Sequence, residues 1–318
     1  MSTPLRIGTR GSRLAVAQTG QIVDRLRGLG RDVVVETIST RGDARGDMPV
    51  AMLGGDGVFV RELERALLDD RIDVAIHSLK DMPTAAVPGL EIACVPARAT
   101  PFDVLVGRPG DTLATLPAGA RVGTSSIRRV LQLKAARPDL DVQPIRGNVD
   151  TRLTRLDAGD YRCLVLAAAG LERLGLGGRI TAILAPPDFW PAVGQGALGL
   201  QIRAGDEAAW QAIAPLDDVA THLAVRAERS CLAELAGGCL APVAGWARLD
   251  PDGSLRLGAR VLEQTDHAVG NVLAEDAVAT RDGPAAQALG RRVAESLLAA
   301  GAGPMLERMR AHAVGDTV

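Results

Sequence analysis

Three segments of the chain place arginine and hydroxyl side chains where a predicted strand gives way to a helix. They are Thr9-Arg10-Gly11-Ser12-Arg13, Thr124-Ser125-Ser126-Ile127-Arg128-Arg129 and Arg146-Gly147-Asn148-Val149-Asp150-Thr151-Arg152. A helix N-terminus offers free N–H groups and the positive end of the helix dipole, and arginine binds carboxylates and phosphates through paired hydrogen bonds. Any one segment also suits an ordinary capped helix with solvated arginines. Together they indicate a ligand with several carboxylates or phosphates.

A lysine and an aspartate lie side by side at the end of another predicted strand. The segment is His77-Ser78-Leu79-Lys80-Asp81-Met82-Pro83. Pro83 predicts that no helix runs through Asp81. An aspartate near cations stays ionised and can handle protons or a developing positive charge, so this pair suits a cleft, although a surface ion pair is the alternative. We expect His77 to be structural because no second histidine lies at metal-ligand spacing.

Cys239 is the best candidate for a nucleophile. It lies in Gly237-Gly238-Cys239-Leu240-Ala241-Pro242, where two glycines and a proline predict a tight loop. A loop thiol can be presented to a cleft and is strongly nucleophilic, whereas the alternative is a small buried apolar residue. The other cysteines, Cys94, Cys163 and Cys231, form no C-x-x-C pair, so we expect no structural zinc and no disulfide framework.

Composition restricts the class of protein. The chain has 318 residues, of which 47% are hydrophobic, and this predicts two or three packed domains. The net charge of -2 and the aromatic content of 2% argue against a nucleic-acid or membrane-surface partner. The N-terminus lacks an apolar signal core and no run reaches the length of a membrane helix, so we expect a soluble protein of the reducing cytoplasm.

The first half of the chain alternates strand and helix twice. Strands are predicted at residues 5–8, 33–39 and 74–77 with helices at 12–29 and 58–68, and this order implies a mostly parallel sheet with helices on both faces. A second such unit has strands near residues 104–106, 121–123, 142–145 and 163–167 and helices starting near Ser126 and Thr151. Pro186-Pro187 and residues 193–196 suggest a crossing back between the units, and two such lobes enclose a ligand cleft.

The pattern changes near Asp218. A helix at residues 219–235, strands at 243–249 and 255–261 around a hairpin signal at 251–253, and a helix at 285–299 predict an α+β domain that carries Cys239. Residues 41–57 contain five glycines and no clear period, which suggests a lid loop.

The motifs occur in an order and spacing that resemble the porphobilinogen deaminase (hydroxymethylbilane synthase) family over nearly the whole chain. Besides the segments above, the resemblance rests on Thr40-Arg41-Gly42-Asp43, Phe59-Val60-Arg61-Glu62-Leu63-Glu64 and Ala192-Val193-Gly194-Gln195-Gly196. It implies an α/β fold of two periplasmic-binding-protein-like lobes with a central cleft, plus a smaller α+β C-terminal domain. The expected domains are residues 1–98 with 197–216, residues 99–196, and residues 217–318.

The resemblance also implies the chemistry. A transferase of porphyrin, tetrapyrrole and heme biosynthesis would condense four porphobilinogen molecules, with loss of ammonia, onto a dipyrromethane cofactor joined to Cys239 by a thioether, and would release linear hydroxymethylbilane by hydrolysis. Asp81 would be the catalytic carboxylate. The cofactor would be bound by Ser12, Lys80, Asp81, Thr124, Ser125, Ser126, Arg128, Arg129, Arg146 and Gly147. The substrate would be bound by Arg10, Ser12, Phe59, Arg146, Arg152, Arg173 and Gln195.

The sequence departs from the family pattern at one loop, and two other classes of protein are alternatives. Gly54-Gly55-Asp56-Gly57 departs from the Gly-Gly-Lys-Gly of many relatives, which puts a role for Asp56 in substrate binding in doubt. A non-catalytic cytoplasmic anion-binding module is an alternative, but it does not explain the third domain or the Cys239 loop. A nucleic-acid-binding protein is opposed by the charge of -2 and the separated arginine sites. We expect a monomer without a metal.

Overall fold

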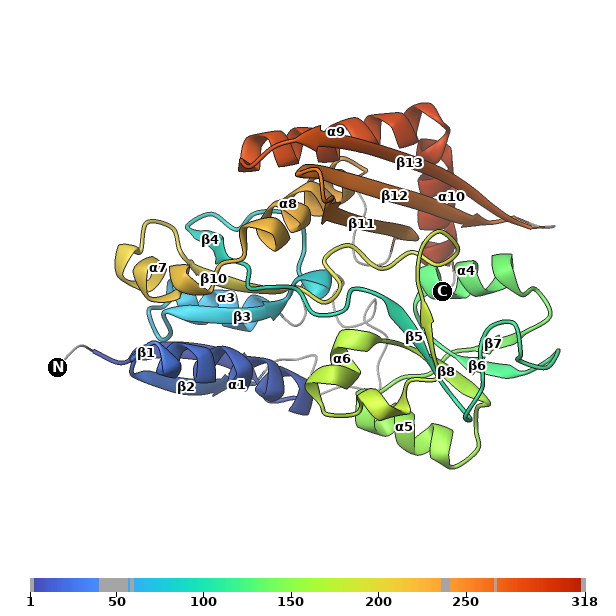
Figure 1. Ribbon diagram of the computed structural model, residues 1–318, viewed down its shortest axis with the longest axis horizontal. Helices are drawn as coiled ribbons and strands as arrows, with labels where there is room; N and C mark the ends of the chain where they lie inside the picture. The colour runs from blue at the N-terminus through green and yellow to red at the C-terminus, as the bar shows by residue number, and fades with distance from the viewer. Residues whose placement is uncertain (1–2, 40–56, 58–59, 236–240, 266–267, 316–318) are drawn as a thin grey trace. The chain divides into compact units, whose positions relative to one another are not determined.

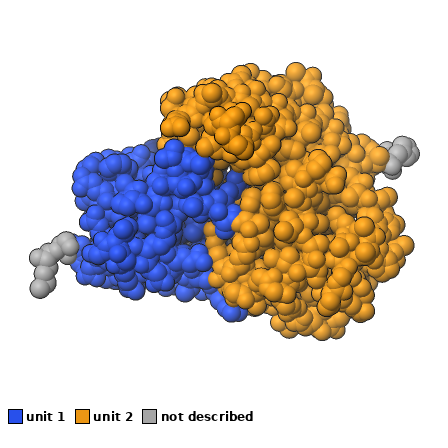
Figure 2. Space-filling view, in the orientation of Figure 1, with its two compact units in different colours: residues 1–99, 196–222 blue, residues 100–195, 223–318 orange. Residues whose placement is uncertain are grey.

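The computed structural model describes residues 3–39, 57, 60–235, 241–265 and 268–315, without the side chains of residues 310 and 312–315. The chain forms two compact units, which are coloured separately in Figure 2. The first comprises residues 1–99 and 196–222, and the second comprises residues 100–195 and 223–318. Among the described residues, no helix is long and apolar enough to cross a membrane.

The first unit is built on a five-stranded sheet in the order β2-β1-β3-β10-β4 (Figure 1). Its strands are β1 (Leu5–Arg10), β2 (Val33–Ile38), β3 (Val74–Ser78), β4 (Leu90–Cys94) and β10 (Leu198–Arg203). Strands β1, β2 and β3 are parallel, whereas β10 runs antiparallel to both of its neighbours. The mostly parallel sheet predicted from sequence is therefore confirmed, with one reversed strand that the sequence pattern did not reveal.

Helices cover both faces of this sheet, as predicted. They are α1 (Arg13–Gly28), α3 (Arg61–Leu68), α7 (Glu207–Ile213) and the short 3-10 helices η2 (Leu79–Asp81) and η4 (Ala214–Leu216). Ile22 and Leu26 of α1 pack with Ile7 in one core cluster, and Leu63 and Leu67 of α3 pack in another. The two clusters lie on opposite faces because successive strand side chains alternate between them.

The second unit contains a sheet of the same plan, in the order β7-β6-β8-β5-β9. Its strands are β5 (Asp103–Val106), β6 (Arg121–Gly123), β7 (Asp141–Gln143), β8 (Cys163–Ala167) and β9 (Ala182–Leu184). The helices are α4 (Ile127–Ala136), α5 (Val149–Asp157), α6 (Ala168–Arg173) and the 3-10 helix η3 (Gly177–Arg179). Here β6, β7 and β8 are parallel and β5 is the reversed strand.

The two sheets thus repeat one topology, in which a reversed strand lies beside the third parallel strand. β10 has this position in the first sheet and β5 has it in the second. Two sheets of this topology, with β10 returning to the first sheet after the second is complete, match two periplasmic-binding-protein-like lobes, so the predicted α/β class and its lobes are confirmed.

A third, antiparallel sheet in the order β11-β12-β13 completes the second unit. The elements of this region are α8 (Val219–Glu234), β11 (Val243–Leu249), β12 (Ser254–Gln264), β13 (Val269–Ala279), α9 (Gly283–Ala299) and α10 (Ala302–Gly315). Leu289, Val293 and Leu297 recur every four residues on α9 and pack against this sheet, which confirms the predicted α+β architecture (Figure 1). A Cβ added at Gly290 would lie 2.3 Å from the carbonyl oxygen of Ala227, so α8 and α9 approach closely there.

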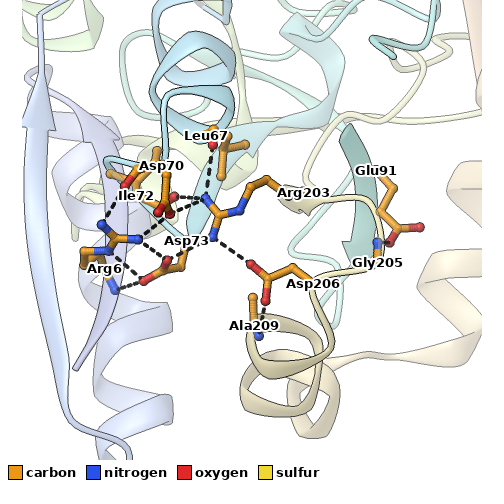
Figure 3. Close-up of polar contacts among 10 residues, drawn as sticks. All are labelled: Arg6, Leu67, Asp70, Ile72, Asp73, Glu91, Arg203, Gly205, Asp206 and Ala209. Carbon is orange, nitrogen blue, oxygen red and sulfur yellow. Dashed lines mark hydrogen bonds and ion pairs between the residues drawn. The ribbon is translucent and has the colours of Figure 1, made fainter. Parts of the chain in front are cut away.

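Charged side chains join the amino-terminal edge of the first sheet (Figure 3). Asp73, just before β3, accepts hydrogen bonds from Arg6 of β1 at 2.6 Å and from Arg203 of β10 at 3.0 Å. Asp70 pairs with Arg6 at 2.8 Å, and Asp206 pairs with Arg203 at 2.7 Å. These five residues, the Asp73 cluster, tie three strands together. Burial raises the pKa of Asp73, but the hydrogen bonds from the two arginines outweigh it and lower that pKa.

Candidate active site

The carboxyl ends of β1 and β3 bring two of the predicted segments to one edge of the first sheet. The two strands are adjacent and parallel, so the chain leaves both at the same edge. Ser12 caps α1 by accepting a hydrogen bond from the backbone N–H of Ala15 at 3.3 Å. Gln18 of α1 donates to Ser78 Oγ, at the end of β3, over 2.9 Å. This bond holds the helix after Arg10 beside the turn that carries Asp81.

The Lys80–Asp81 turn is anchored on both sides by buried residues. Leu79 and Met82 are buried, whereas Asp81 is exposed and Lys80 is half-buried. Leu79 packs over Gly199 of β10, where an added Cβ would lie 2.5 Å from Leu79 Cδ2. The prediction that no helix runs through Asp81 is wrong in detail. A single 3-10 turn ends at Asp81, because a turn of three residues is complete before Pro83 can interrupt it.

His77 lies in β3, just before this turn, and takes part in a series of linked hydrogen bonds. Its Nε2 lies 2.9 Å from Gln201 Oε1, and Gln201 Nε2 donates to Glu64 Oε1 over 3.3 Å. The amide oxygen can only accept, so His77 carries its proton on Nε2 in this arrangement. These contacts agree with the structural role expected for His77.

A similar edge in the second unit gathers the other predicted segments. β6, β7 and β8 are parallel, and α4, α5 and α6 begin shortly after their carboxyl ends. Ser125 Oγ both donates to the carbonyl of Ile145, at 2.7 Å, and accepts from its N–H, at 3.0 Å. Thr124 is buried, and its hydroxyl accepts from the N–H of Ser126 at 3.3 Å. The hydroxyls of Thr124 and Ser125 therefore shape the loop, and their contact with a ligand stays a prediction.

Arg128 and Arg129 differ from the solvated arginines of an ordinary helix start. Their exposed fractions are 4% and 6%, and both pair with Asp103, whose exposed fraction is 0%. The distances are 2.7 Å from Arg128 Nη1 to Asp103 Oδ2 and 2.7 Å from Arg129 Nη2 to Oδ1. Burial alone would raise the pKa of Asp103, but the two arginines outweigh it and hold that pKa at about 2. Whether the same arginines also bind a ligand stays a prediction.

The segment from Arg146 to Arg152 forms a tight turn into α5. Gly147 has φ +96°, and a Cβ there would lie 2.8 Å from Cβ of Thr151. Asn148 caps α5 by accepting from the N–H of Thr151 at 2.9 Å. Arg152 Nε donates to the carbonyl of Gly147 over 2.8 Å, while Arg146 is exposed. The structure thus brings these residues together at one helix N-terminus, as predicted.

Arg173 and Gln195 are the remaining described residues of the predicted set. Arg173 ends α6, and burial lowers the pKa of its guanidinium to about 10 against the opposing charge of Glu172, so it stays protonated at neutral pH. Gln195 Nε2 donates to the carbonyl of Pro101 at 2.7 Å and to Asp103 Oδ1 at 3.0 Å. Gln195 is therefore part of the same buried set as Arg128 and Arg129.

Three cysteines are buried and free. Burial is the largest cause that raises the pKa of Cys163 and of Cys231, each to about 12, and it also raises the pKa of Cys94. Such thiols are poor nucleophiles at neutral pH. Cys239, Phe59 and Asp56 lie outside the described residues, as does most of the predicted lid loop. Within the part of the chain that the structure describes, no group of three His, Cys, Asp or Glu residues could hold a metal ion.

Sequence reasoning missed two residues at these edges. Asp103 begins β5, and the only sequence signal was one acidic residue at the head of the apolar run Asp103-Val104-Leu105-Val106. Gln18 donates the hydrogen bond that joins α1 to β3. In the sequence it could be noticed only as a polar residue among the core positions of a predicted helix, and the structure shows that it is buried.

The chain is similar to known proteins over most of its length. Residues 5–211 match the family model "Porphobilinogen deaminase, dipyromethane cofactor binding domain", and residues 222–299 match "Porphobilinogen deaminase, C-terminal domain". A porphobilinogen deaminase of Syntrophobacter fumaroxidans is 44% identical over 309 residues, which is 96% of this chain and 97% of the relative. One of Bordetella parapertussis is 48% identical over 309 residues, covering 96% of each chain.

A solved periplasmic substrate-binding protein of an ABC transporter from Coxiella burnetii matches 67% of this chain and 91% of its own, with a TM-score of 0.42 and 15% identity. The two family models together cover both lobes and most of the C-terminal region. The chain therefore belongs to the porphobilinogen deaminase family.

Proposed function

We propose that this chain is a hydroxymethylbilane synthase, a transferase of porphyrin, tetrapyrrole and heme biosynthesis. It condenses four porphobilinogen molecules with loss of ammonia on a covalent dipyrromethane cofactor and releases linear hydroxymethylbilane. One observation carries the proposal: within a chain matched by the family over residues 5–211 and 222–299, one sheet edge presents the exposed carboxylate of Asp81 and another gathers arginines at helix N-termini. No observation favours the non-catalytic anion-binding module.

The donor set at these edges fits a dipyrromethane group. Each of its two porphobilinogen units carries two carboxylates, and the second edge offers guanidinium groups, hydroxyls and the start of α5. We infer that the cofactor is held by Ser12, Lys80, Thr124, Ser125, Ser126, Arg128, Arg129, Arg146 and Gly147, and is attached through a thioether to Cys239. When bound, the cofactor supplies the pyrrole carbon that attacks the activated substrate.

Asp81 is the residue suited to the positive charge of the reaction. Porphobilinogen loses ammonia from its aminomethyl group and leaves a cationic azafulvene-like electrophile. A carboxylate accepts hydrogen bonds from the departing ammonium and the pyrrole N–H, and it stabilises the cation electrostatically. The anchored turn between Leu79 and Met82 holds Asp81 in place while leaving it exposed.

Arginines are suited to the carboxylates of the substrate. We propose that Arg10, Arg146, Arg152 and Arg173, with Ser12, Phe59 and Gln195, contact porphobilinogen. A planar guanidinium forms two parallel bonds to one carboxylate, so it fixes the orientation of a ring as well as its charge. Each added ring brings two more carboxylates, which explains why more than one arginine site is needed.

We further infer a monomer of the cytoplasm with three domains: residues 1–98 with 197–216, residues 99–196, and residues 217–318. The free thiols of Cys94, Cys163 and Cys231 support a reducing compartment. Size-exclusion chromatography with light scattering tests the monomer, and limited proteolysis followed by mass spectrometry tests the boundaries.

The function is tested by incubating the purified protein with porphobilinogen and measuring ammonia and hydroxymethylbilane. An enzyme of this family releases both, whereas an anion-binding module binds porphobilinogen and releases neither. Intact-mass measurement of the protein as purified reports the cofactor independently of activity. We expect the mass of two porphobilinogen units less two ammonia molecules. An active protein of unmodified mass would exclude the covalent cofactor.

A further inference from the structure

Asp103 lies at the carboxyl-terminal edge of the second sheet, where the predicted anion sites are. It is the first residue of β5 and is paired in register with Ala167, the last residue of β8. With Arg128, Arg129 and Gln195 it forms a buried group, which we call the Asp103 cluster. The mechanism proposed above uses the two arginines but assigns no part to Asp103.

Each of the two arginines donates hydrogen bonds both to Asp103 and to a backbone carbonyl of another element. Arg128 Nη1 donates to Asp103 Oδ2 at 2.7 Å and to the carbonyl of Trp190 at 2.5 Å. Arg129 Nε donates to Asp103 Oδ1 at 3.0 Å, while its Nη1 donates to the carbonyl of Val165 at 2.9 Å. A guanidinium bound at two points by different elements cannot rotate about its stem. Asp103 therefore determines the orientation of both cations.

The charge balance of the Asp103 cluster differs from that of two other groups of aspartate and arginine in the structure. It pairs two arginines with one carboxylate, which leaves one positive charge among the described contacts. In contrast, the Asp73 cluster pairs two arginines with three aspartates (Figure 3). Asp111 pairs with Arg162 one to one, at the amino-terminal end of β8. The excess of cation thus occurs at the edge where Arg146 is exposed and α4 and α5 begin.

We propose that Asp103 is a positioning residue for the deaminase reaction: it presents Arg128 and Arg129 in a fixed orientation and leaves one net positive charge to bind a carboxylate of the pyrrole ligand. This inference rests on the proposed function. Two buried guanidinium groups repel one another and lose hydration, so a carboxylate between them is required for both to coexist. A single carboxylate is sufficient for this, whereas a second one would cancel the charge that attracts the ligand.

The test compares Asp103→Asn with Asp111→Asn. Both variants remove one buried carboxylate that accepts hydrogen bonds from arginine in the same unit, but Asp111 pairs with Arg162 at the opposite end of β8. We expect both to lower Tm. Only Asp103→Asn should lower the fraction of protein that carries the cofactor mass, and raise KM for porphobilinogen at least about tenfold. Asp111→Asn should keep both within about twofold of the parent.

A second measurement reports the orientation of the Arg129 guanidinium and does not depend on enzyme activity. In ¹H–¹⁵N spectra, the Arg129 Nε–H should exchange slowly with water in the parent and in Asp111→Asn, and should lose this protection in Asp103→Asn. Asp103→Glu keeps the charge but displaces the carboxylate by one methylene, and it serves if Asp103→Asn does not fold. It should raise KM at least about threefold and weaken the protection of Arg129 Nε–H.

Each outcome decides the proposal. If the foldable Asp103 variant keeps the cofactor mass, KM and Arg129 protection of Asp111→Asn, Asp103 is only a structural ion pair and the proposal is overturned. If the parent itself releases no ammonia from porphobilinogen, the proposed function has failed. The Arg129 signal then decides by itself whether Asp103 orients the arginine pair.

Discussion

Two aspartates near strand ends, one buried and one exposed, have different roles because they differ in access to solvent and ligand. Asp103 is fully buried, and its oxygens already accept bonds from Arg128, Arg129 and Gln195. A carboxylate in that position neutralises the protein's own cations. Asp81 is exposed at the end of a turn whose neighbours are buried. A carboxylate there can meet a cation that arises during a reaction, which is why we assign the chemistry to Asp81.

Replacing Asp81 by asparagine should lower turnover far more than stability. Loss of a carboxylate aimed at developing positive charge should reduce kcat by two to three decades, or about 3–4 kcal/mol, by analogy with the loss of an oxyanion-hole donor. The Tm should change little because Asp81 is exposed. Asp24→Asn, on the exposed side of α1, is the matched control and should leave both quantities near those of the parent. A near-normal kcat for Asp81→Asn with a complete cofactor would refute the assignment.

The cysteines should differ sharply in reactivity. Burial raises the pKa of Cys163 and Cys231 to about 12, and raises that of Cys94 as well, so all three remain neutral thiols at pH 8. Iodoacetamide applied to the folded protein should leave them unmodified, and peptide mapping should find the dipyrromethane adduct on Cys239. Cys239→Ser should lack the adduct, whereas Cys231→Ala should retain it. An adduct found on one of the buried cysteines would contradict the proposed attachment.

At the scale of elements, the sequence predicted the periodic parts well. Strands β6, β8 and β11 have the predicted bounds, and α1 begins after the predicted cap at Ser12. β5 was predicted as a strand without its direction, because an apolar run buried on both faces carries no signal of direction, and β10 was not predicted as a strand. The sequence also did not indicate β4, β9, β13, α6, α7 or α10.

The candidate site was predicted in part for a similar reason. Glycine, hydroxyl and arginine residues at helix starts are local signals, so the segments around Arg10, Arg128 and Arg146 could be found in the sequence. The partner of Arg128 and Arg129 could not, because Asp103 lies 25 and 26 residues away in the chain and meets them only when β5 is inserted beside β8. The burial of both arginines follows from that long-range pairing.

The turn at Gly147 offers a test of how an element positions a site. Gly147 and Gly159 both have positive φ, +96° and +85°, but only at Gly147 would a Cβ meet other atoms, Thr151 at 2.8 Å. Gly159→Ala should therefore cost only the backbone strain, about 1 kcal/mol. Gly147→Ala should cost about 1–3 kcal/mol more, because the start of α5 must move. That movement should also raise KM by displacing Arg146 and Arg152, whereas Gly159→Ala should leave KM unchanged. Urea unfolding and steady-state kinetics provide the two measurements, and equal effects of the two variants would contradict the clash.

At the scale of the whole molecule, the balance of acidic and arginine side chains differs between the amino-terminal ends of the strands in both five-stranded sheets and the carboxyl-terminal end of the second sheet. Acidic partners equal or outnumber arginines at the amino-terminal ends, in the Asp73 cluster and in the pair of Asp111 with Arg162. Arginines outnumber acids in the Asp103 cluster, at a carboxyl-terminal end. Parallel strands put the helix N-termini at these same ends, so the helix dipoles and the excess arginine charge attract anions to one edge. The polycarboxylate binding that we propose is therefore compatible with a net charge of -2.

The same aspartates should determine how the protein responds to acid. The folded-state pKa values of Asp73 and Asp111 are lowered, and that of Asp103 is about 2, because arginine pairing outweighs the opposing effect of burial. A carboxylate whose pKa is lower in the folded state contributes stability above its unfolded pKa, and this contribution is lost as the pH falls through the folded value. The free energy of unfolding should therefore decrease as the pH falls below about 4, and the contribution of Asp103 should persist to about pH 2. Urea unfolding followed by circular dichroism between pH 3 and pH 6 should give a shallower decrease for Asp73→Asn and Asp111→Asn than for the parent, while the exposed control Asp24→Asn keeps the parent slope. If all four proteins lose stability with the same slope, these ion pairs contribute no acid-sensitive stability.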